Sequence, residues 1–436
     1  MAVAGLGFVP CEQLEDRPHL MVDGASRPSS VLTLSHWPST PTPPVLWRDL
    51  SAESVLAYLR AATDGVTAQR VTAQAAGASA ELSAALEAGA SAEAVTNDHF
   101  DEDGLVSVFA AVAPESALGV AELLVDVASC GDFGVVRSDE AAQVAFALLG
   151  LAEAEAGLGA GTGERYLAVL PRVAELLGHP ERFRSFWADE FAAFALGRDA
   201  LRSGAVEIEA VPGLDFAVVR RGDGPPGTVG VAEMSGRLPG ASGGLPIHAA
   251  AVHSATPATR LLAFDGDFCE LYLRYEGWVR YVSRAVALRP DLAPLALELS
   301  SLEPGPGGVE WEANAVGAIV GRLRPSGDGR TNIAPELVRS TVERYLARAK
   351  PTWDPFRPGG GYIPPAERRR YLAAVAGRAG AAGGVGGAAA ESFGRPAPAP
   401  REDGAPRMTS QAMRDGSGHP RPRHCRGPTS LAHAVR

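Results

Sequence analysis

The sequence predicts an α/β fold, in which a parallel-sheet N-terminal domain with helices is followed by a smaller α+β domain and a disordered C-terminal tail. Short apolar runs alternate with Ala-rich helical patterns in the first half of the chain. Residues 206–282 instead alternate apolar and polar residues, as paired strands do. After about residue 356, Pro-, Gly- and Ala-rich sequence lacks a periodic apolar face. We therefore expect an α/β domain at 15–203, an α+β domain at 204–356 and a tail at 357–436.

The elements of the first domain follow from periodicity and from helix and turn signals. A helix is expected near Ser51, because Asp49 and Ser51 are both N-cap residues before an apolar stripe. The strand ending at 95–96 and the strand at 123–127 would each be followed by or end in acidic residues, with one helix between them. Together they would form a parallel βαβ unit. The expected strands are 19–24, 30–36, a strand ending at 95–96, and 123–127. The expected helices are 51–59, 61–93, one starting at Leu105, 140–151 and 182–201.

The second domain begins where the composition changes. Asp265-Gly266-Asp267 is typical of a hairpin turn. The expected elements are strands within 206–219, a Gly-rich connection at 222–244, a strand at 247–252, a hairpin within 261–282, a helix at 291–301, a strand at 309–311 and a helix at 335–348.

Composition and charge exclude several classes of protein. The 436 residues are 46% hydrophobic and carry a formal net charge of −11, although the tail from Arg357 holds 13 arginines against five acidic residues. The remaining body is therefore acidic, which argues against specific binding of duplex nucleic acid. No run of eighteen apolar residues and no leader pattern is present, so we expect a cytoplasmic protein with no membrane partner. The four cysteines form no C-x-x-C pair, which argues against a zinc knuckle or a disulfide framework.

Residues 97–107 contain the clearest candidate site. This loop holds His99 together with four carboxylates, among them Asp101 and Asp103, and closes with a glycine. Acids spaced two apart direct oxygens toward one point, where divalent cations bind. Capping of the helix at Leu105 is the simpler interpretation, but one acid suffices for a cap. Further acids repel each other by about 1 kcal/mol per close pair, so the excess favours a bound cation.

The motif His99-x-Asp101-x-Asp103-Gly104-Leu105-x-Ser107 resembles the first motif of the DHH (RecJ-like) phosphoesterase superfamily. The resemblance implies that His99, Asp101 and Asp103 are catalytic metal ligands for Mn²⁺ or Mg²⁺, with Ser107 in the following helix. It also implies that Asp126, at the end of the next predicted strand, is the superfamily's second metal-binding aspartate, with Asp132 as second choice.

Four further residues are candidates for this site. His36 follows a predicted strand, so it could face the same sheet edge as His99 and bind metal, or be a hydrogen-bonded structural residue beside Trp37. Arg137 is the expected phosphate clamp. His248 and His253 are candidate substrate-binding residues, although their spacing would place them on opposite faces of a strand.

Considered as a whole, the chain resembles proteins of an uncharacterised actinobacterial family, through residues 22–24, 32–38, 97–107 and 125–134. The resemblance spans most of residues 15–350 and implies no known activity.

Two functions are expected from these observations. The first is metal-assisted hydrolysis of a phosphorylated small molecule or a short oligonucleotide. The second is non-catalytic binding of a ligand or partner on a degenerate phosphoesterase-like fold, which the absence of an Asp-His-His sequence favours. An EF-hand is excluded, because Ala110 would stand where the loop needs a bidentate glutamate.

Overall fold

The first sheet is parallel throughout and has four strands. The computed structural model describes residues 5–64, 73–157, 159–221, 247–305, 308–358, 360–371 and 373, all within one compact unit. The strands of this first sheet are β1 (Gly7–Phe8), β2 (His19–Val22), β3 (Ser30–Leu34) and β4 (Ala94–Thr96), in the order β1-β4-β2-β3. Every residue of β2 and β4 is buried, as expected for parallel strands that are covered on both faces. The carboxyl ends of β4, β2 and β3 therefore lie side by side at one edge.

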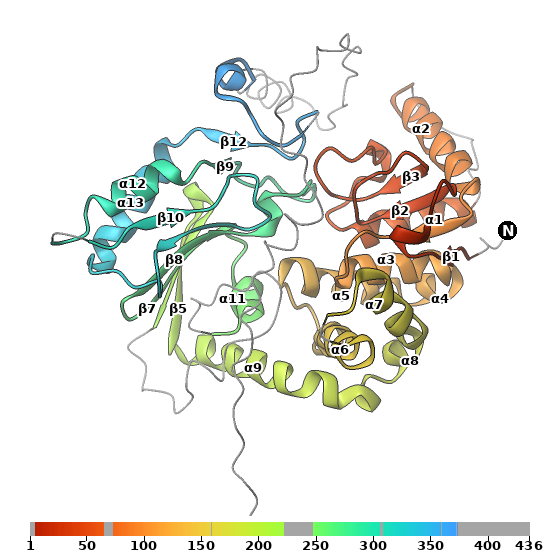
Figure 1. Ribbon diagram of the computed structural model, residues 1–436, viewed down its shortest axis with the longest axis horizontal. Coiled ribbons are helices and arrows are strands. Elements are labelled where there is room, and N and C mark those ends of the chain that lie inside the picture. The colour runs from red at the N-terminus through yellow and green to blue at the C-terminus, as the bar shows by residue number, and fades with distance from the viewer. Residues whose placement is uncertain are drawn as a thin grey trace, which may run out of the picture. The chain divides into compact units, whose positions relative to one another are not determined.

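Helices pack around this sheet, and the helical region continues to Ser203 (Figure 1). Next to the sheet are α1 (Ser51–Asp64), α2 (Ala73–Ala90), α3 (Glu102–Val112), α4 (Pro114–Gly119) and α5 (Ala121–Phe133). The chain continues as α6 (Asp139–Ala156), α7 (Thr162–Val169), α8 (Val173–Gly178) and α9 (Arg184–Ser203). The α3 helix packs against β4, α1 and α5, so the segment after β4 is held between the sheet and two helices.

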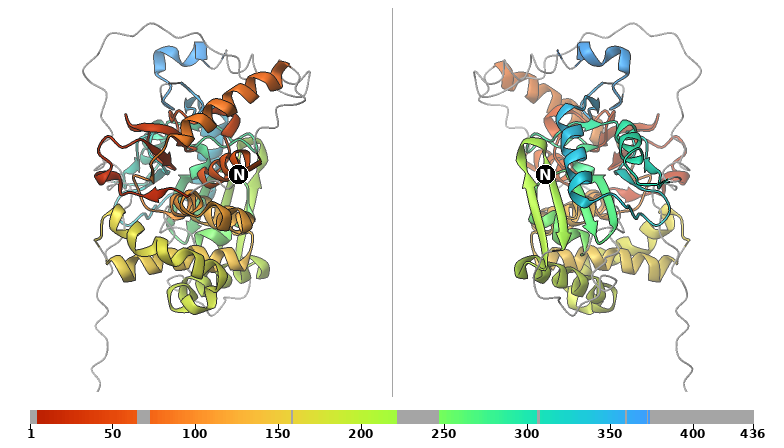
Figure 2. Two further views of the ribbon diagram at one scale, coloured as in Figure 1. Left: turned by 90° about the vertical axis from the view of Figure 1, so that its right-hand side faces the viewer. Right: turned by 90° about the vertical axis from the view of Figure 1, so that its left-hand side faces the viewer.

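The second sheet has six strands and is mostly antiparallel. Its strands are β5 (Val206–Val211), β6 (Phe216–Arg221), β7 (Arg260–Asp265), β8 (Phe268–Leu273), β10 (Trp311–Ala313) and β11 (Gly321–Pro325), in the order β10-β11-β8-β7-β6-β5. Two helices, α12 (Ala293–Ser300) and α13 (Pro335–Arg348), share a buried apolar cluster with it. Figure 2 shows α13 lying across these strands.

Shorter elements complete the described chain. The helix α11 (Ala249–Ala255) packs on α9, and β9 (Arg289–Pro290) pairs with β12 (Pro351–Trp353). The 3-10 turns are η1 (Cys11–Gln13), η2 (Pro44–Leu46), η3 (Leu170–Arg172), η4 (Pro180–Phe183), η5 (Pro212–Leu214) and η6 (Tyr275–Gly277).

The fold class expected from the sequence is confirmed, but two of its strands are wrong. Residues 123–127 lie within α5 and residues 249–252 within α11, so the predicted βαβ unit does not exist. Leu124, Val127 and Ala128 are buried at helical spacing, and a short apolar run does not distinguish this pattern from a buried strand. The predicted connection at 222–244, and the tail beyond residue 373, lie outside the described residues. Within the described part of the chain, no helix has the length and apolar composition needed to cross a membrane.

Candidate metal centre

The ends of three neighbouring parallel strands bring together acidic and imidazole side chains. Asp23 directly follows β2, His36 lies two residues after β3, and the loop containing His99 follows β4. Strand carboxyl ends are where open α/β sheets usually place a ligand. His36 therefore does face the same sheet edge as His99.

Asp23 lies at the centre of this group. Its side chain is 1% exposed, and its Oδ1 accepts a 2.7 Å hydrogen bond from Ser51 Oγ. Oδ1 lies 3.6 Å from His36 Nε2, whereas Oδ2 lies 3.3 Å from His99 Nε2. The backbone of Asp23 has φ 46°, a left-handed conformation that costs energy in a residue other than glycine. This strained turn aims one carboxylate oxygen at each of two imidazoles.

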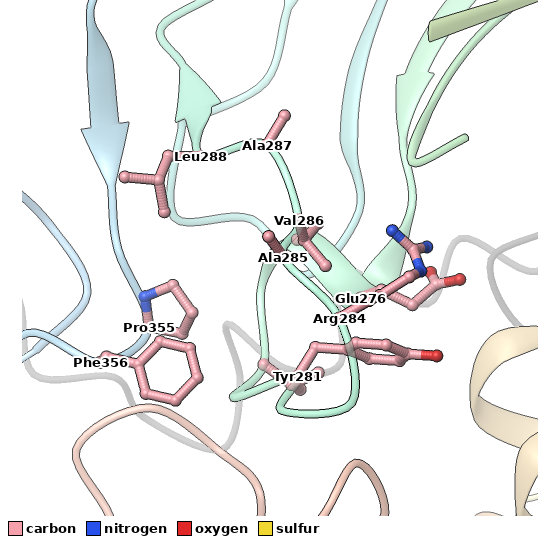
Figure 3. A pocket seen from close by; sticks show the side chains of 11 residues that line it. Glu276, Tyr281, Arg284, Ala285, Val286, Ala287, Leu288, Pro355 and Phe356 are labelled. Atoms are coloured by element: carbon pink, nitrogen blue, oxygen red, sulfur yellow. The ribbon is translucent and has the colours of Figure 1, made fainter. Parts of the chain in front are cut away.

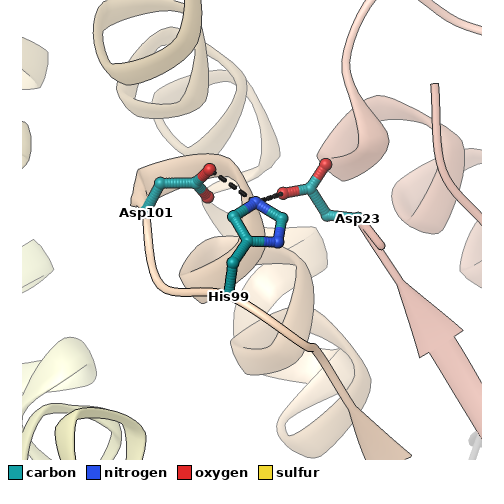
Figure 4. A group of neighbouring side chains, drawn as sticks. All are labelled: Asp23, His99 and Asp101. Carbon is teal, nitrogen blue, oxygen red and sulfur yellow. Dashed lines mark hydrogen bonds and ion pairs between the residues drawn. The ribbon is translucent and has the colours of Figure 1, made fainter. Parts of the chain in front are cut away.

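His99 is surrounded by carboxylates (Figure 4). Its Nε2 lies 2.7 Å from Asp101 Oδ2, and its Nδ1 donates to Asp98 Oδ1 at 3.1 Å. Burial lowers the pKa of His99, but the charges and hydrogen bonds of Asp101, Asp23 and Asp98 outweigh it and raise the pKa well above its usual value. The imidazolium of His99 is therefore the counter-charge of these acids.

His36 has the opposite protonation state. Its Nδ1 donates to the carbonyl of Asp49 at 2.6 Å, which assigns the lone pair to Nε2. Burial lowers the pKa of His36 to about 4, so the ring is neutral. Its Nε2 lies 3.3 Å from Asp132 Oδ2 and accepts from the Tyr275 hydroxyl at 3.1 Å. A neutral nitrogen lone pair that faces carboxylate oxygens is an arrangement suited to a bound cation.

Helix capping accounts for part of the acidic loop. Asp101 is the N-cap of α3, and its Oδ1 accepts from the Gly104 amide at 2.8 Å. Asp103 instead accepts from the first two amides of a different helix, α1, at 2.8 Å from Ser51 and 2.7 Å from Ala52. These bonds leave Asp101 Oδ2 directed at His99.

Gly104 is required by the tight packing of the loop. A Cβ at this position would lie 2.1 Å from Asn97 Nδ2 and 2.7 Å from Tyr166 Oη. Asn97 in turn accepts from the His99 amide at 3.0 Å. The glycine thus lets the backbone approach the residues that position His99.

Two sets of side chains have the spacing of metal ligands. One contains Asp23, His99 and Asp101, the other Asp23, His36 and Asp103, and within each set the ligand atoms lie within 4.8 Å of one another. Bonds of about 2.0 to 2.2 Å place two ligands of one ion up to about 4.4 Å apart, so small adjustments would close either set around an ion. Asp23 is common to both sets.

Two buried carboxylate oxygens support this fit. Asp132 Oδ2 has no hydrogen-bond donor among the described residues, and Asp23 Oδ2 has only the 3.3 Å contact with His99 Nε2, which already lies 2.7 Å from Asp101. Burial raises the pKa of Asp132 well above its usual value, and Asp103 raises it further. Buried oxygens without a donor are costly, and a divalent cation would satisfy both.

Asp126, Arg137, His248 and His253 lie outside these sets. Asp126 lies on α5 rather than at a strand end, and it pairs at 3.2 Å with Arg137, whose side chain is 51% exposed. The acid of α5 that reaches the centre is Asp132.

The two downstream histidines have structural partners. His248 is the N-cap of α11 and pairs with Glu190 at 3.0 Å. His253 donates to the Phe133 carbonyl at 2.9 Å and accepts from the Tyr272 hydroxyl at 2.8 Å.

Sequence reasoning missed Asp23 and Tyr275. Asp23 ends an apolar run and precedes a glycine, which is the same signal that identified the loop after β4. Tyr275 lies 239 residues from His36 along the chain and has no local signal that connects the two.

A model of a family of unknown function (DUF6687) matches residues 5–357 of the chain. The matched range includes both sheets and every residue of the centre. No curated protein and no solved structure matches the chain.

Proposed function

The chain belongs to this family of unknown function, and we propose that it is a phosphoester hydrolase that uses two divalent metal ions, Mn²⁺ or Mg²⁺. The proposal assigns one ion to Asp23, His99 and Asp101 and the other to Asp23, His36 and Asp103. Asp132 lies beside the second set. The expected substrate is a phosphorylated small molecule or a short oligonucleotide.

The single observation that carries the proposal is the position of Asp23 between two imidazoles. One of its oxygens approaches His36 Nε2 at 3.6 Å, and the other approaches His99 Nε2 at 3.3 Å. A carboxylate shared in this way holds two ions close together, as two-metal sites require. Bound ions would lower the pKa of a coordinated water and neutralise the phosphoryl oxygens.

The surrounding residues support the individual ligands. Asp98 accepts from Nδ1 of His99, and the Asp49 carbonyl accepts from Nδ1 of His36. Each partner orients its ring with Nε2 toward the acids and makes that nitrogen more basic.

Two buried donors beside the centre suit a phosphoryl group. Trp37 stacks on His99 at 4.9 Å between ring centroids, and its indole N–H has no acceptor among the described residues. Arg280 is 3% exposed, and its backbone amide donates to the His36 carbonyl at 2.9 Å. Its guanidinium lies over the Trp47 ring and donates through Nη2 to Thr40. Its Nη1 has no hydrogen bond within the described ranges. Arg280 therefore replaces Arg137 as the proposed phosphate clamp.

The DHH-like loop supports phosphoester chemistry, and the absence of an Asp-His-His sequence weighs against it. In this chain Asp23 and His36 supply a strand-end aspartate and an imidazole from positions that precede the loop. The proposal therefore depends on the geometry of the centre more than on the motif.

Calorimetric titration of the full chain with Mn²⁺ tests the proposal. We expect about two ions per chain, and we expect Asp23→Asn to weaken binding of both by at least 100-fold, since it removes the shared ligand. Asp126→Asn is the matched control, because Asp126 is an acid of α5 that lies outside both sets, and it should bind like wild type. A wild-type chain that binds no Mn²⁺, or equal binding by Asp23→Asn, would refute the metal centre.

A hydrolysis assay with Mn²⁺ separates catalysis from simple binding. Suitable substrates are bis-p-nitrophenyl phosphate, nucleotides and short oligonucleotides. Hydrolysis of any of these substrates by wild type, and its loss in Asp23→Asn, would support the hydrolase proposal. A chain that binds Mn²⁺ but leaves every substrate intact is instead the non-catalytic binding protein.

A further inference from the structure

Asp49 joins the two halves of the chain beside the metal centre. It lies between η2 and α1 and is half-buried. Its Oδ1 accepts hydrogen bonds from the backbone amides of Val282 at 2.6 Å and Ser283 at 2.9 Å, which lie 233 and 234 residues further along the chain. Hydrogen bonds to a carboxylate are roughly twice as strong as those between neutral groups. The two amides therefore anchor Asp49 to the second half of the chain.

The loop that carries these amides runs between Tyr281 and Arg284, which are both labelled in Figure 3. The amide of Arg280, which immediately precedes this stretch, donates to the His36 carbonyl at 2.9 Å. Backbone groups of one loop therefore contact the first half of the chain both at His36 and at Asp49.

The carbonyl of Asp49 selects the tautomer of His36. A neutral imidazole carries one proton, on either Nδ1 or Nε2. Nδ1 donates to this carbonyl at 2.6 Å, whereas Nε2 lies 3.3 Å from Asp132 Oδ2 and 3.6 Å from Asp23 Oδ1. A proton on Nε2 would be attracted to these two carboxylates, so the other tautomer competes. The short bond to the carbonyl favours the proton on Nδ1 and leaves the lone pair on Nε2.

This choice of tautomer decides whether His36 can bind an ion. If the Asp49 carbonyl shifts, the proton moves to Nε2 and removes the lone pair that a cation needs. All three members of this ligand set, Asp23, His36 and Asp103, come from the first half of the chain. The set nevertheless depends on the second half, through the anchor at Asp49.

The ligand set of His99 has a separate support. Nδ1 of His99 donates to Asp98 Oδ1 at 3.1 Å, and Asp98 Oδ2 accepts from the Ala25 amide at 3.2 Å. Both supporting residues belong to the first half of the chain. Loss of the Asp49 anchor should therefore affect the set of His36 and leave the set of His99 as it is.

From these contacts we infer that Asp49 is a positioning residue of the metal centre. Its carboxylate, anchored on two amides of the second half, holds the carbonyl that keeps the His36 proton on Nδ1 and the lone pair on Nε2. The consequence for metal binding rests on the proposed function, whereas the tautomer of His36 does not.

Nitrogen NMR of the full chain with ¹⁵N-labelled histidine, without added metal, tests the tautomer, because protonated and unprotonated ring nitrogens resonate far apart. His36→Gln identifies the signals of His36. Wild type should carry the proton on Nδ1, and Asp49→Ala should carry it on Nε2. Asp49→Asn, whose side-chain carbonyl can accept from the same amides, should retain the wild-type tautomer. An unchanged tautomer in Asp49→Ala, or the same change in Asp49→Asn, would overturn the inference.

Mn²⁺ titration in two backgrounds tests the consequence for metal binding. His99→Ala retains the ligand set of His36, and His36→Ala retains that of His99. Added to His99→Ala, Asp49→Ala should weaken Mn²⁺ binding at least tenfold, as loss of an outer-shell partner does. Added to His36→Ala, it should leave the affinity unchanged. An equal loss in both backgrounds, or no loss in either, would refute the selective role of Asp49.

Asp215→Ala is the matched control. Asp215 is also half-buried, and its carboxylate accepts from the amides of Thr259 and Ala287, each at 3.0 Å, so it too joins distant segments. Its loss should lower stability and leave the tautomer and the Mn²⁺ affinity unchanged. A change as large as that in Asp49→Ala would mean that any loosening of the fold has this effect.

Ser283→Pro replaces Asp49→Ala if the latter does not fold. Proline removes one of the two amide donors and leaves Asp49 itself in place. It should move part of the His36 population to the Nε2 tautomer, and a wild-type tautomer would contradict the inference.

The two proposals fail separately. A wild-type chain that binds no Mn²⁺ removes the hydrolase proposal, while the change of tautomer in Asp49→Ala would still establish the positioning role. Mn²⁺ binding with an unchanged tautomer in Asp49→Ala removes the positioning role and leaves the hydrolase proposal.

Discussion

The carboxyl of Asp23 and the neutral ring of His36, which follow adjacent strands, face each other without a hydrogen bond between them. The lone pair of His36 Nε2 and the Oδ1 atom of Asp23 lie 3.6 Å apart, while Nδ1 of the ring donates to the Asp49 carbonyl. This contact gains little without a cation between the two atoms. It therefore predicts that the metal-free protein is strained at the centre.

The first prediction concerns the stability of metal-free Asp23→Asn. Burial, followed by the charge of Asp101, raises the pKa of Asp23 from 3.8 to about 7. Between these pH values the folded chain binds a proton that the unfolded chain releases, so this carboxyl's contribution to stability falls as pH rises from about 4 to 7. The slope is up to about 1.4 kcal/mol per pH unit.

Asp23→Asn removes this loss, so the metal-free variant should gain stability relative to wild type as pH rises to 7. Urea unfolding in the presence of a chelator, at pH 5 and pH 7.5, measures the difference. Identical pH dependence of the two proteins would contradict the prediction.

The second prediction concerns Tyr275→Phe. The Tyr275 hydroxyl donates to Nε2 of His36, the same nitrogen that would bind the proposed ion. Removal of the hydroxyl should leave Mn²⁺ affinity unchanged or raise it a few-fold, because a competitor for the lone pair is lost. A tenfold loss of affinity in a Mn²⁺ titration would instead mean that the hydroxyl supports the ion.

The third prediction compares two glycines. Gly104→Ala should destabilise the chain by about 1–3 kcal/mol, since its Cβ would lie 2.1 Å from Asn97 Nδ2. Gly119→Ala is the control, because nothing lies within 4 Å of its Cβ, and it should cause no loss. Thermal and urea unfolding of both variants measure the difference. Equal stability of the two variants would mean that the loop relaxes around the added methyl group.

The fourth prediction concerns His253. Burial, followed by the charge of Arg274, lowers the pKa of His253 well below 6.5. Below pH 6.5 the unfolded chain therefore binds a proton that the folded chain does not, and stability is lost as pH falls. This loss is absent in His253→Gln. Below pH 6.5 the free energy of unfolding of wild type should therefore fall by up to about 1.4 kcal/mol per pH unit more than that of the variant. Urea unfolding at pH 7 and pH 5.5 tests this, and equal losses in the two proteins would exclude His253 as the cause.

The sequence predicted the local surroundings of the centre better than its assembly. The loop after β4 and the helix that follows it were predicted, since an acidic Gly-closed segment between two apolar runs is a local pattern. The helix α13 was predicted with its observed ends, Pro335 and Arg348. The strand before Asp23 was predicted as well, but nothing local indicates that β4 pairs with β2, and this pairing places Asp23 beside His99.

The errors have a common physical origin. Residues 123–127 and 247–252 are short apolar runs that fit a buried strand or a buried helix equally well. The first error moved the expected ligand from Asp132 to Asp126. Tyr275 reaches His36 only through the packing of the second half of the chain, which no spacing along the sequence encodes.

The order of the strands determines when the acidic groups meet during synthesis. Once the first ninety residues have emerged, β2 can pair with β3, but its other edge remains open, because β4 has yet to insert between β1 and β2. Until then Asp23 and His36 have no contact with the loop of His99. The carboxylates of Asp23 and of the His99 loop are thus brought together in the same step in which β4 pairs with β1 and β2. The repulsion between these carboxylates therefore arises only when the backbone hydrogen bonds of β4 form and can offset it.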